Sequence, residues 1–189
     1  MKTIFLGSLL LWLSTATAQK KWVVHDSDFA FVLRADTGEG WIAVRRVTVY
    51  RLPRWEKIQT ITLPENNVQD FGEGPFLIED MNFDGHDDFR VVSITTTNFQ
   101  RSFWFWFYDE DKHIFYRDTI YDGFPEISFD HKNKTVHYYS TCCIGWGSHG
   151  LYKWENGKLT LIGEEEGDDL DLSIPGPRHS ASECWLRKK

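Results

Sequence analysis

Residues 89–117, FRVVSITTTNFQRSFWFWFYDEDKHIFYR, have the clearest β-strand pattern in the chain. Two runs within this stretch, 89–95 and 101–108, are dominated by the β-branched and aromatic residues that favour strands. The polar residues 109–112 predict a turn, and 113–117 predict a return strand. The stretch therefore predicts long apolar strands joined in an antiparallel hairpin.

Strand patterns continue on the N-terminal side of this stretch. Residues 22–34 are a β-rich stretch that ends at the turn residues 36–38, and we expect a strand to begin in it. Residues 41–50 alternate apolar and polar positions, and 57–63 resume the pattern after Pro53. These two segments predict a second hairpin.

A third hairpin is predicted from 149–154 and 158–162, because Asn156-Gly157 between them supplies the positive φ angles of a tight reversal. In each hairpin a tyrosine precedes a polar turn that contains Lys. These tyrosines, Tyr50, Tyr108 and Tyr152, are 58 and then 44 residues apart. Such spacing lies in the range of repeated β units, although a strand-rich chain also produces it by chance.

The composition agrees with an all-β protein. The chain has 189 residues, of which 41% are hydrophobic and 16% aromatic, so it can bury a core as one domain. Aromatic residues suit half-buried sheets, which argues against an all-α bundle. We expect a single domain of antiparallel hairpins, either propeller-like or sandwich-like.

Residues 1–18 are typical of a signal peptide. Lys2 precedes an apolar run over 4–13, and Ala16-Thr17-Ala18 provides the small residues that signal peptidase requires. We expect cleavage after Ala18 and a periplasmic or secreted protein with no membrane span in the mature chain. The alternative is an uncleaved N-terminal anchor. No Cys stands directly after the cleavage point, so a lipoprotein is not indicated.

The net charge is negative. Cleavage would remove one cation of 21, which leaves 20 against 28 acids and a net charge of −8. The basic groups, Lys20-Lys21, Arg45-Arg46 and 187–189, are short, which argues against nucleic acid as a partner. An acidic protein instead attracts cations and basic proteins.

Residues 19–163 are expected to form the β domain.

Residues 164–189 predict an irregular, acidic C-terminal extension. An oxidising compartment favours a disulfide that tethers it. Cys184 can pair with Cys142 or with Cys143, and neighbouring positions of a strand point to opposite faces, so one of the two stays free. The sequence does not decide between them.

One motif carries specific chemistry. Residues 80–88 read DMNFDGHDD, in which oxygen ligands stand at positions one, three, five and nine around a glycine at position six. This order suits Ca²⁺, which takes six to eight oxygen ligands. The predicted ligands are the side chains of Asp80, Asn82, Asp84 and Asp88, together with the backbone carbonyl of His86.

The loop is not an EF-hand, because Val91 stands where the bidentate Glu would be and a strand follows. The alternative is an acidic turn without metal, since Asp and Asn also bond their own backbone. We expect the ion to be structural and to fasten the strands on either side of the loop.

The segment FLIEDMNFDGHDDFRVVS (76–93) resembles the calcium loop of FG-GAP type β-propeller repeats. The order VTVYR, IQTI, calcium loop, FWFWFYDEDKHIFY and LYKWENGKLTLI also resembles a family of bacterial periplasmic proteins, over about residues 28–163. The known representative of that family is an immunity protein that restrains a lysozyme-like toxin of a bacteria-killing type IV secretion system. The resemblance implies a calcium-dependent β fold and inhibition by a loop inserted into the glycosidase cleft.

Residues 144–152, IGWGSHGLY, are the candidate for such a loop, because glycines allow its backbone to enter a narrow cleft. Ser148 and His149 could hydrogen-bond catalytic carboxylates, with Trp146 and Tyr152 beside them. The alternative is an ordinary long turn packed by Trp146.

We do not expect an enzyme, because no nucleophile or zinc-protease motif is present. The favoured function is a calcium-stabilised inhibitor or immunity protein against a lysozyme-like peptidoglycan hydrolase. The alternative is an envelope or surface carbohydrate-binding module that stacks sugars of peptidoglycan or another glycan on aromatic residues of 103–108 and on Trp146.

Overall fold

The computed structural model describes residues 18–66, 68–69, 74–96, 99–143 and 146–167. All regular elements within these ranges are β-strands, and no helix in them could cross a membrane. The strands are β1 (Ala18–His25), β2 (Phe29–Gly38), β3 (Trp41–Arg51), β4 (Glu56–Thr62), β5 (Val68–Gln69), β6 (Phe76–Glu79), β7 (Asp88–Thr95), β8 (Arg101–Asp109), β9 (Ile114–Asp118), β10 (Ser128–Asp130), β11 (Thr135–Cys143), β12 (Trp146–Glu155) and β13 (Lys158–Gly167).

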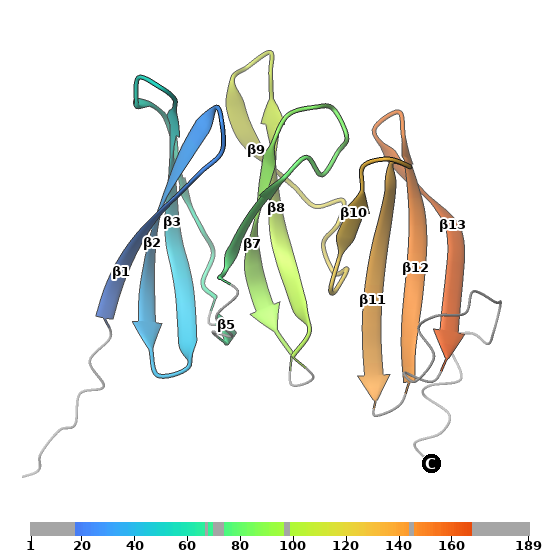
Figure 1. Ribbon diagram of the computed structural model, residues 1–189. Coiled ribbons are helices and arrows are strands. Elements are labelled where there is room, and N and C mark those ends of the chain that lie inside the picture. Colours follow the sequence, from blue (N-terminus) through green and yellow to red (C-terminus); the bar gives the residue numbers. More distant parts are fainter. Residues whose placement is uncertain (1–17, 67, 70–73, 97–98, 144–145, 168–189) are drawn as a thin grey trace, which may run out of the picture.

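The strands form three antiparallel sheets, each an up-and-down meander of four consecutive strands. The first sheet has the order β1-β2-β3-β4, with β5 added beside β3; the central sheet is β6-β7-β8-β9; the third sheet is β10-β11-β12-β13. Figure 1 shows the three sheets side by side, with the central sheet between the other two. One hydrophobic core contains residues of all three sheets, so the chain is a single sandwich-like domain.

The aromatic run of β8 explains the layer order. Its successive side chains point to opposite faces of the central sheet, and both faces are covered. Trp106 stacks on Phe89 at 5.0 Å, on the face whose aromatic cluster includes Phe31 of the first sheet. Phe107 points the other way and meets Trp154 of the third sheet at 6.3 Å. A strand covered on both sides needs apolar residues at every position.

The structure confirms the expected all-β, antiparallel fold and the three predicted hairpins. Tyr50, Tyr108 and Tyr152 lie in β3, β8 and β12, the third strand of each meander. The shared pattern of a tyrosine before a polar turn therefore reflects a repeated unit of four strands.

The β-rich stretch 22–34 contains parts of two strands, β1 and β2. Asp26 makes the turn between them: its Oδ1 accepts the backbone amides of Asp28 and Phe29, each at 2.6 Å. A side chain that takes the place of a backbone partner lets the chain reverse within three residues.

The β domain extends beyond its expected end at residue 163, since β13 continues to Gly167 and pairs Glu164 with Gly150. An edge strand exposed to water tolerates a run of acids. The predicted signal peptide, apart from Ala18, and most of the acidic extension, including Cys184, lie outside the described residues. The predicted disulfide therefore stays a prediction.

Candidate metal centre

The predicted calcium loop joins β6 to β7 at one end of the central sheet (Figure 1). The chain reverses sharply at Gly85, whose φ of +95° is a conformation that side chains disfavour. Phe83 also has a positive φ, 61°, and its ring is buried against His131. Tertiary packing thus holds the loop in a tight turn.

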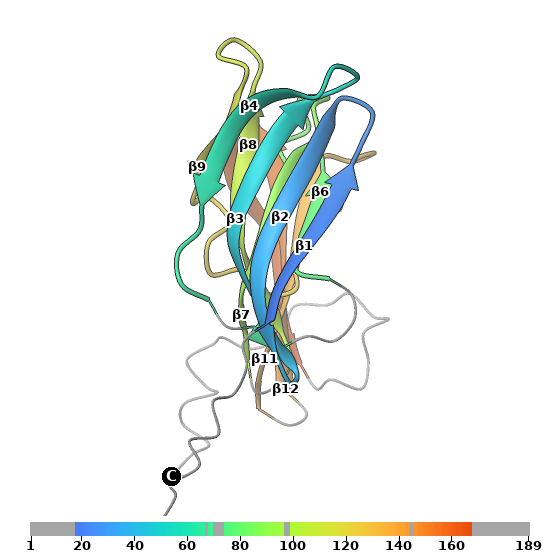
Figure 2. The same ribbon diagram turned by 90° about the vertical axis from the view of Figure 1, so that its left-hand side faces the viewer.

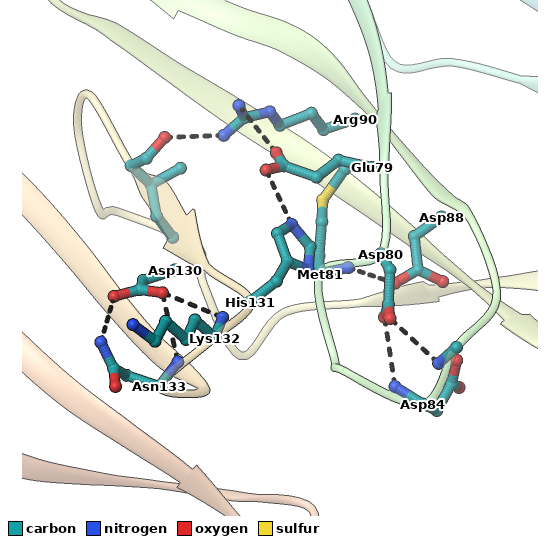
Figure 3. A network of polar contacts seen from close by, with 12 residues as sticks. Glu79, Asp80, Met81, Asp84, Asp88, Arg90, Asp130, His131, Lys132 and Asn133 are labelled. Carbon is teal, nitrogen blue, oxygen red and sulfur yellow. Dashed lines mark hydrogen bonds and ion pairs between the residues drawn. The ribbon is translucent and has the colours of Figure 1, made fainter.

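Asp80 organises the turn from its first position. Its Oδ1 accepts the backbone amide of Asp84 at 3.1 Å, and its Oδ2 accepts that of Gly85 at 2.9 Å (Figure 3). Both oxygens of one carboxylate therefore face the inside of the loop.

Asn82 and Asp84 complete the same arrangement. Asn82 Oδ1 also accepts the amide of Asp84 at 3.0 Å, and Asp84 Oδ1 accepts the amide of His86 at 2.8 Å. The Asn82 amide group donates to Asp84 Oδ2 at 2.8 Å. The structure thus brings three of the predicted ligand side chains together within one turn.

Asp88 has a different setting, because it is fully buried at the start of β7. Its Oδ2 accepts the amide of Met81 at 2.9 Å and its Oδ1 accepts the amide of Tyr108 at 2.9 Å. Burial raises the pKa of Asp88 to about 8, and the negative charges of Asp84 and Asp80 act in the same direction. A cation beside this carboxylate would favour its ionised form.

The donor set is made of oxygens only, which suits a hard cation such as Ca²⁺. Each carboxylate oxygen that accepts one amide keeps a further lone pair for an ion. Among the described residues, however, no three His, Cys, Asp or Glu side chains are already placed around a common ion position. The residues fit calcium by chemistry, while their arrangement here is that of a hydrogen-bonded acidic turn.

Residues far away in sequence support the loop. The buried hydroxyl of Tyr121 donates to the carbonyl of Met81 at 2.7 Å, and Lys134 Nζ donates to the carbonyl of Phe83 at 3.2 Å. Tyr121 lies between β9 and β10, and Lys134 lies in the turn between β10 and β11. No sequence pattern predicts these two contacts, because each residue reaches the loop only through tertiary packing.

A buried arginine lies next to the loop (Figure 3). Arg90 donates to the carbonyl of Ile127 at 2.8 Å and contacts Glu79 Oε2 at 3.5 Å, while Glu79 Oε1 lies 3.3 Å from His131 Nε2. The guanidinium also sits 4.6 Å from the centroid of the Phe103 ring. Burial lowers the pKa of Arg90. This network ties the central sheet to the third sheet beside the candidate site.

The predicted inhibitory loop is wrong in its structure, because from Trp146 onward it is strand β12, paired with β11 and β13. Gly150 is required in this strand because the Tyr138 ring lies across it, 1.9 Å from where a Cβ would stand. Ser148 and Tyr152 share one face of β12, and His149 lies on the other face against Tyr139 at 4.7 Å. The predicted partner-binding residues therefore do not converge, and the side chain of Trp146 lies outside what the structure describes.

The predicted sugar-stacking residues of β8 are core residues. Phe103, Phe105, Trp106, Phe107 and Tyr108 are all buried, and Trp104 is half-buried. Their alternation serves the two covered faces of the central sheet. The structure thus removes the β8 residues from the aromatic platform of the carbohydrate-binding alternative, while the side chain of Trp146 lies outside what the structure describes.

Comparison with known proteins yields a likeness in fold. No model of a known protein family matches the chain, and no curated protein sequence matches it either. A solved structure described as that of a Xanthomonas type IV secretion system related protein is similar, with a TM-score of 0.59. The likeness covers 86% of this chain and 90% of that one at 18% sequence identity, so it establishes a shared fold.

Proposed function

We propose that this protein is an exported, non-enzymatic inhibitor or immunity protein that restrains a lysozyme-like peptidoglycan hydrolase in a type IV secretion context. The fold likeness over 86% of the chain to a type IV secretion system related protein is the observation that carries this proposal. The resemblance of the calcium loop and strand order to a family of periplasmic immunity proteins supports it. Periplasmic or secreted localisation is part of the proposal.

We also propose that Ca²⁺ is held by the side chains of Asp80, Asn82, Asp84 and Asp88 and by the carbonyl of His86. The ion would supply positive charge to a turn whose acids otherwise bond only to backbone amides and Asn82. Its role is structural, because the loop fastens β6 to β7 at the edge of the core.

The end of the molecule that carries this loop is the proposed contact surface for the hydrolase. The turn between β8 and β9 lies at the same end (Figure 1), and its Glu110 approaches His86 Nε2 at 3.2 Å. Asp84, Glu110 and Asp111 are exposed there. An acidic surface of this kind complements a basic enzyme and speeds encounter with it.

The test uses the mature chain, residues 19–189, with purified lysozyme-like hydrolases and a peptidoglycan suspension whose turbidity reports cleavage. We expect stoichiometric suppression of the hydrolase rate and weaker suppression by the double variant Glu110→Gln/Asp111→Asn. The control is Glu39→Gln, an exposed acid in the turn between β2 and β3 at the opposite end. Retention on peptidoglycan without suppression of any hydrolase would contradict the proposal and indicate a glycan-binding protein.

A further inference from the structure

The first sheet carries a row of three cations that lie far apart in the sequence. Lys21 of β1 lies directly opposite Arg34 of β2, and Arg34 lies directly opposite Arg46 of β3. Directly opposed residues point to the same face of a sheet, and all three are exposed. Neighbouring strands are about 4.8 Å apart, so the row spans about 10 Å.

This row borders a hollow of about 460 Å³ on the first sheet. Two further cations line the hollow. Lys20 has its Nζ 4.9 Å from the centroid of the Trp22 ring. Arg45 has its Nε 2.8 Å from Asp36 Oδ2, so the charges of Arg45 and Asp36 offset each other. Figure 2 shows the first sheet face-on, and none of the described segments crosses its outer face. The hollow is of a size that small ligands occupy.

The charges of the row are not compensated within the described part of the chain. None of the ion pairs there includes Lys21, Arg34 or Arg46. Like charges placed directly opposite one another in a sheet are destabilising. The arrangement is therefore unfavourable by itself, and it is unusual in a protein with a net charge of −7. An anion bound between the strands would relieve the repulsion.

We propose that this hollow is a binding site for a ligand that carries two or more linked phosphate groups. Three uncompensated cations within about 10 Å match the charge of a diphosphate, whereas one carboxylate would leave most of the charge unbalanced. Arg34 and Arg46 each present a planar fork of donors that suits phosphate oxygens, and Lys21 adds a point charge. The site is separate from the calcium loop and does not depend on the proposed function.

The test measures binding of inorganic diphosphate to the mature chain by isothermal titration calorimetry in calcium-free buffer at low salt. We expect Arg34→Gln and Arg46→Gln each to weaken binding at least tenfold, with no loss of thermal stability because each removes a like-charge contact. The matched control is Arg54→Gln, an exposed cation in the turn between β3 and β4. Its affinity should stay within twofold of the unmodified protein.

Two sources of linked or neighbouring phosphates are separated by a second arm with vesicles. Sedimentation with vesicles that contain cardiolipin, whose headgroup links two phosphates, but not with phosphatidylcholine vesicles, lost in Arg34→Gln and Arg46→Gln, would support the site and assign it to lipid headgroups. Diphosphate binding without vesicle binding would support a soluble ligand. Absence of both, or equal weakening in Arg54→Gln, would overturn the proposal.

Discussion

The backbone amide of Tyr108, in β8, donates to Oδ1 of Asp88, in β7, at 2.9 Å. Asp88 thereby joins the end of the loop 80–88 to the neighbouring strand of the central sheet, and its other oxygen accepts the backbone amide of Met81. One buried side chain thus fixes the loop at two points.

Replacement of Asp88 by Asn tests this anchor. Asn offers one acceptor oxygen where Asp offers two, so a buried backbone amide loses its partner. We expect the free energy of unfolding at neutral pH to fall by about 1–3 kcal/mol, measured by urea denaturation. Asp111→Asn, in an exposed turn, should change it by less than about 0.5 kcal/mol. An equal effect of both substitutions would contradict the anchoring role.

Tyr121→Phe tests the support that the loop receives from the chain after β9. The substitution removes a fully buried hydroxyl that donates to the carbonyl of Met81 at 2.7 Å. We expect a loss of about 1–3 kcal/mol, since a buried carbonyl is left unpaired. Tyr116→Phe is the matched control, because Tyr116 is 41% exposed. If Tyr121→Phe were as stable as the control, the loop would not depend on this contact.

Arg90→Met tests the tie between the central and third sheets. The variant keeps an apolar stem but leaves Glu79 and the carbonyl of Ile127 without the guanidinium. We expect a loss of about 3 kcal/mol in urea denaturation. Arg54→Met, at an exposed turn, should be nearly neutral. Similar stability of the two variants would show that the third sheet is held by its apolar contacts alone.

The pH dependence of the calcium-free protein follows from the pKa of Asp88, which burial raises to about 8 from an ordinary 3.8. Because the folded protein then binds more protons than the unfolded chain between these values, stability falls as pH rises through this window. We expect the calcium-free protein to be less stable at pH 8 than at pH 5, and Asp88→Asn to have a flatter profile. A profile equally steep in Asp88→Asn would assign the dependence to other groups.

The sequence could predict the hairpins because their signals are local. Alternating apolar residues and the Asn156-Gly157 turn act within a few positions, and the aromatic run of β8 marks a strand buried on both faces. The order of the predicted ligand residues in the loop 80–88 is an equally local signal. Its predicted side chains do gather in one turn, while the metal itself stays a prediction.

Contacts that depend on the register between strands or on tertiary packing could not be predicted from the sequence. The glycines of 144–152 indicated a loop, yet Gly150 is a strand residue because the Tyr138 ring from β11 covers it. Lys21 and Arg46 belong to short basic pairs and Arg34 is isolated in the sequence, and only the strand register sets the three in one row. Tyr121 and Arg90 likewise act through distant backbone carbonyls.

The proposal that residues 80–88 bind calcium predicts that the ion stabilises the fold. Thermal unfolding of residues 19–189, with excess calcium and with chelator, measures this stabilisation. We expect calcium at about 100 times its Kd to raise the Tm by about 5–10 °C, and the shift to vanish in Asp84→Ala while Asp111→Ala retains it. No calcium-dependent shift in the unmodified protein, or an equal shift in Asp84→Ala, would contradict the claim and leave an acidic turn in place of the metal centre.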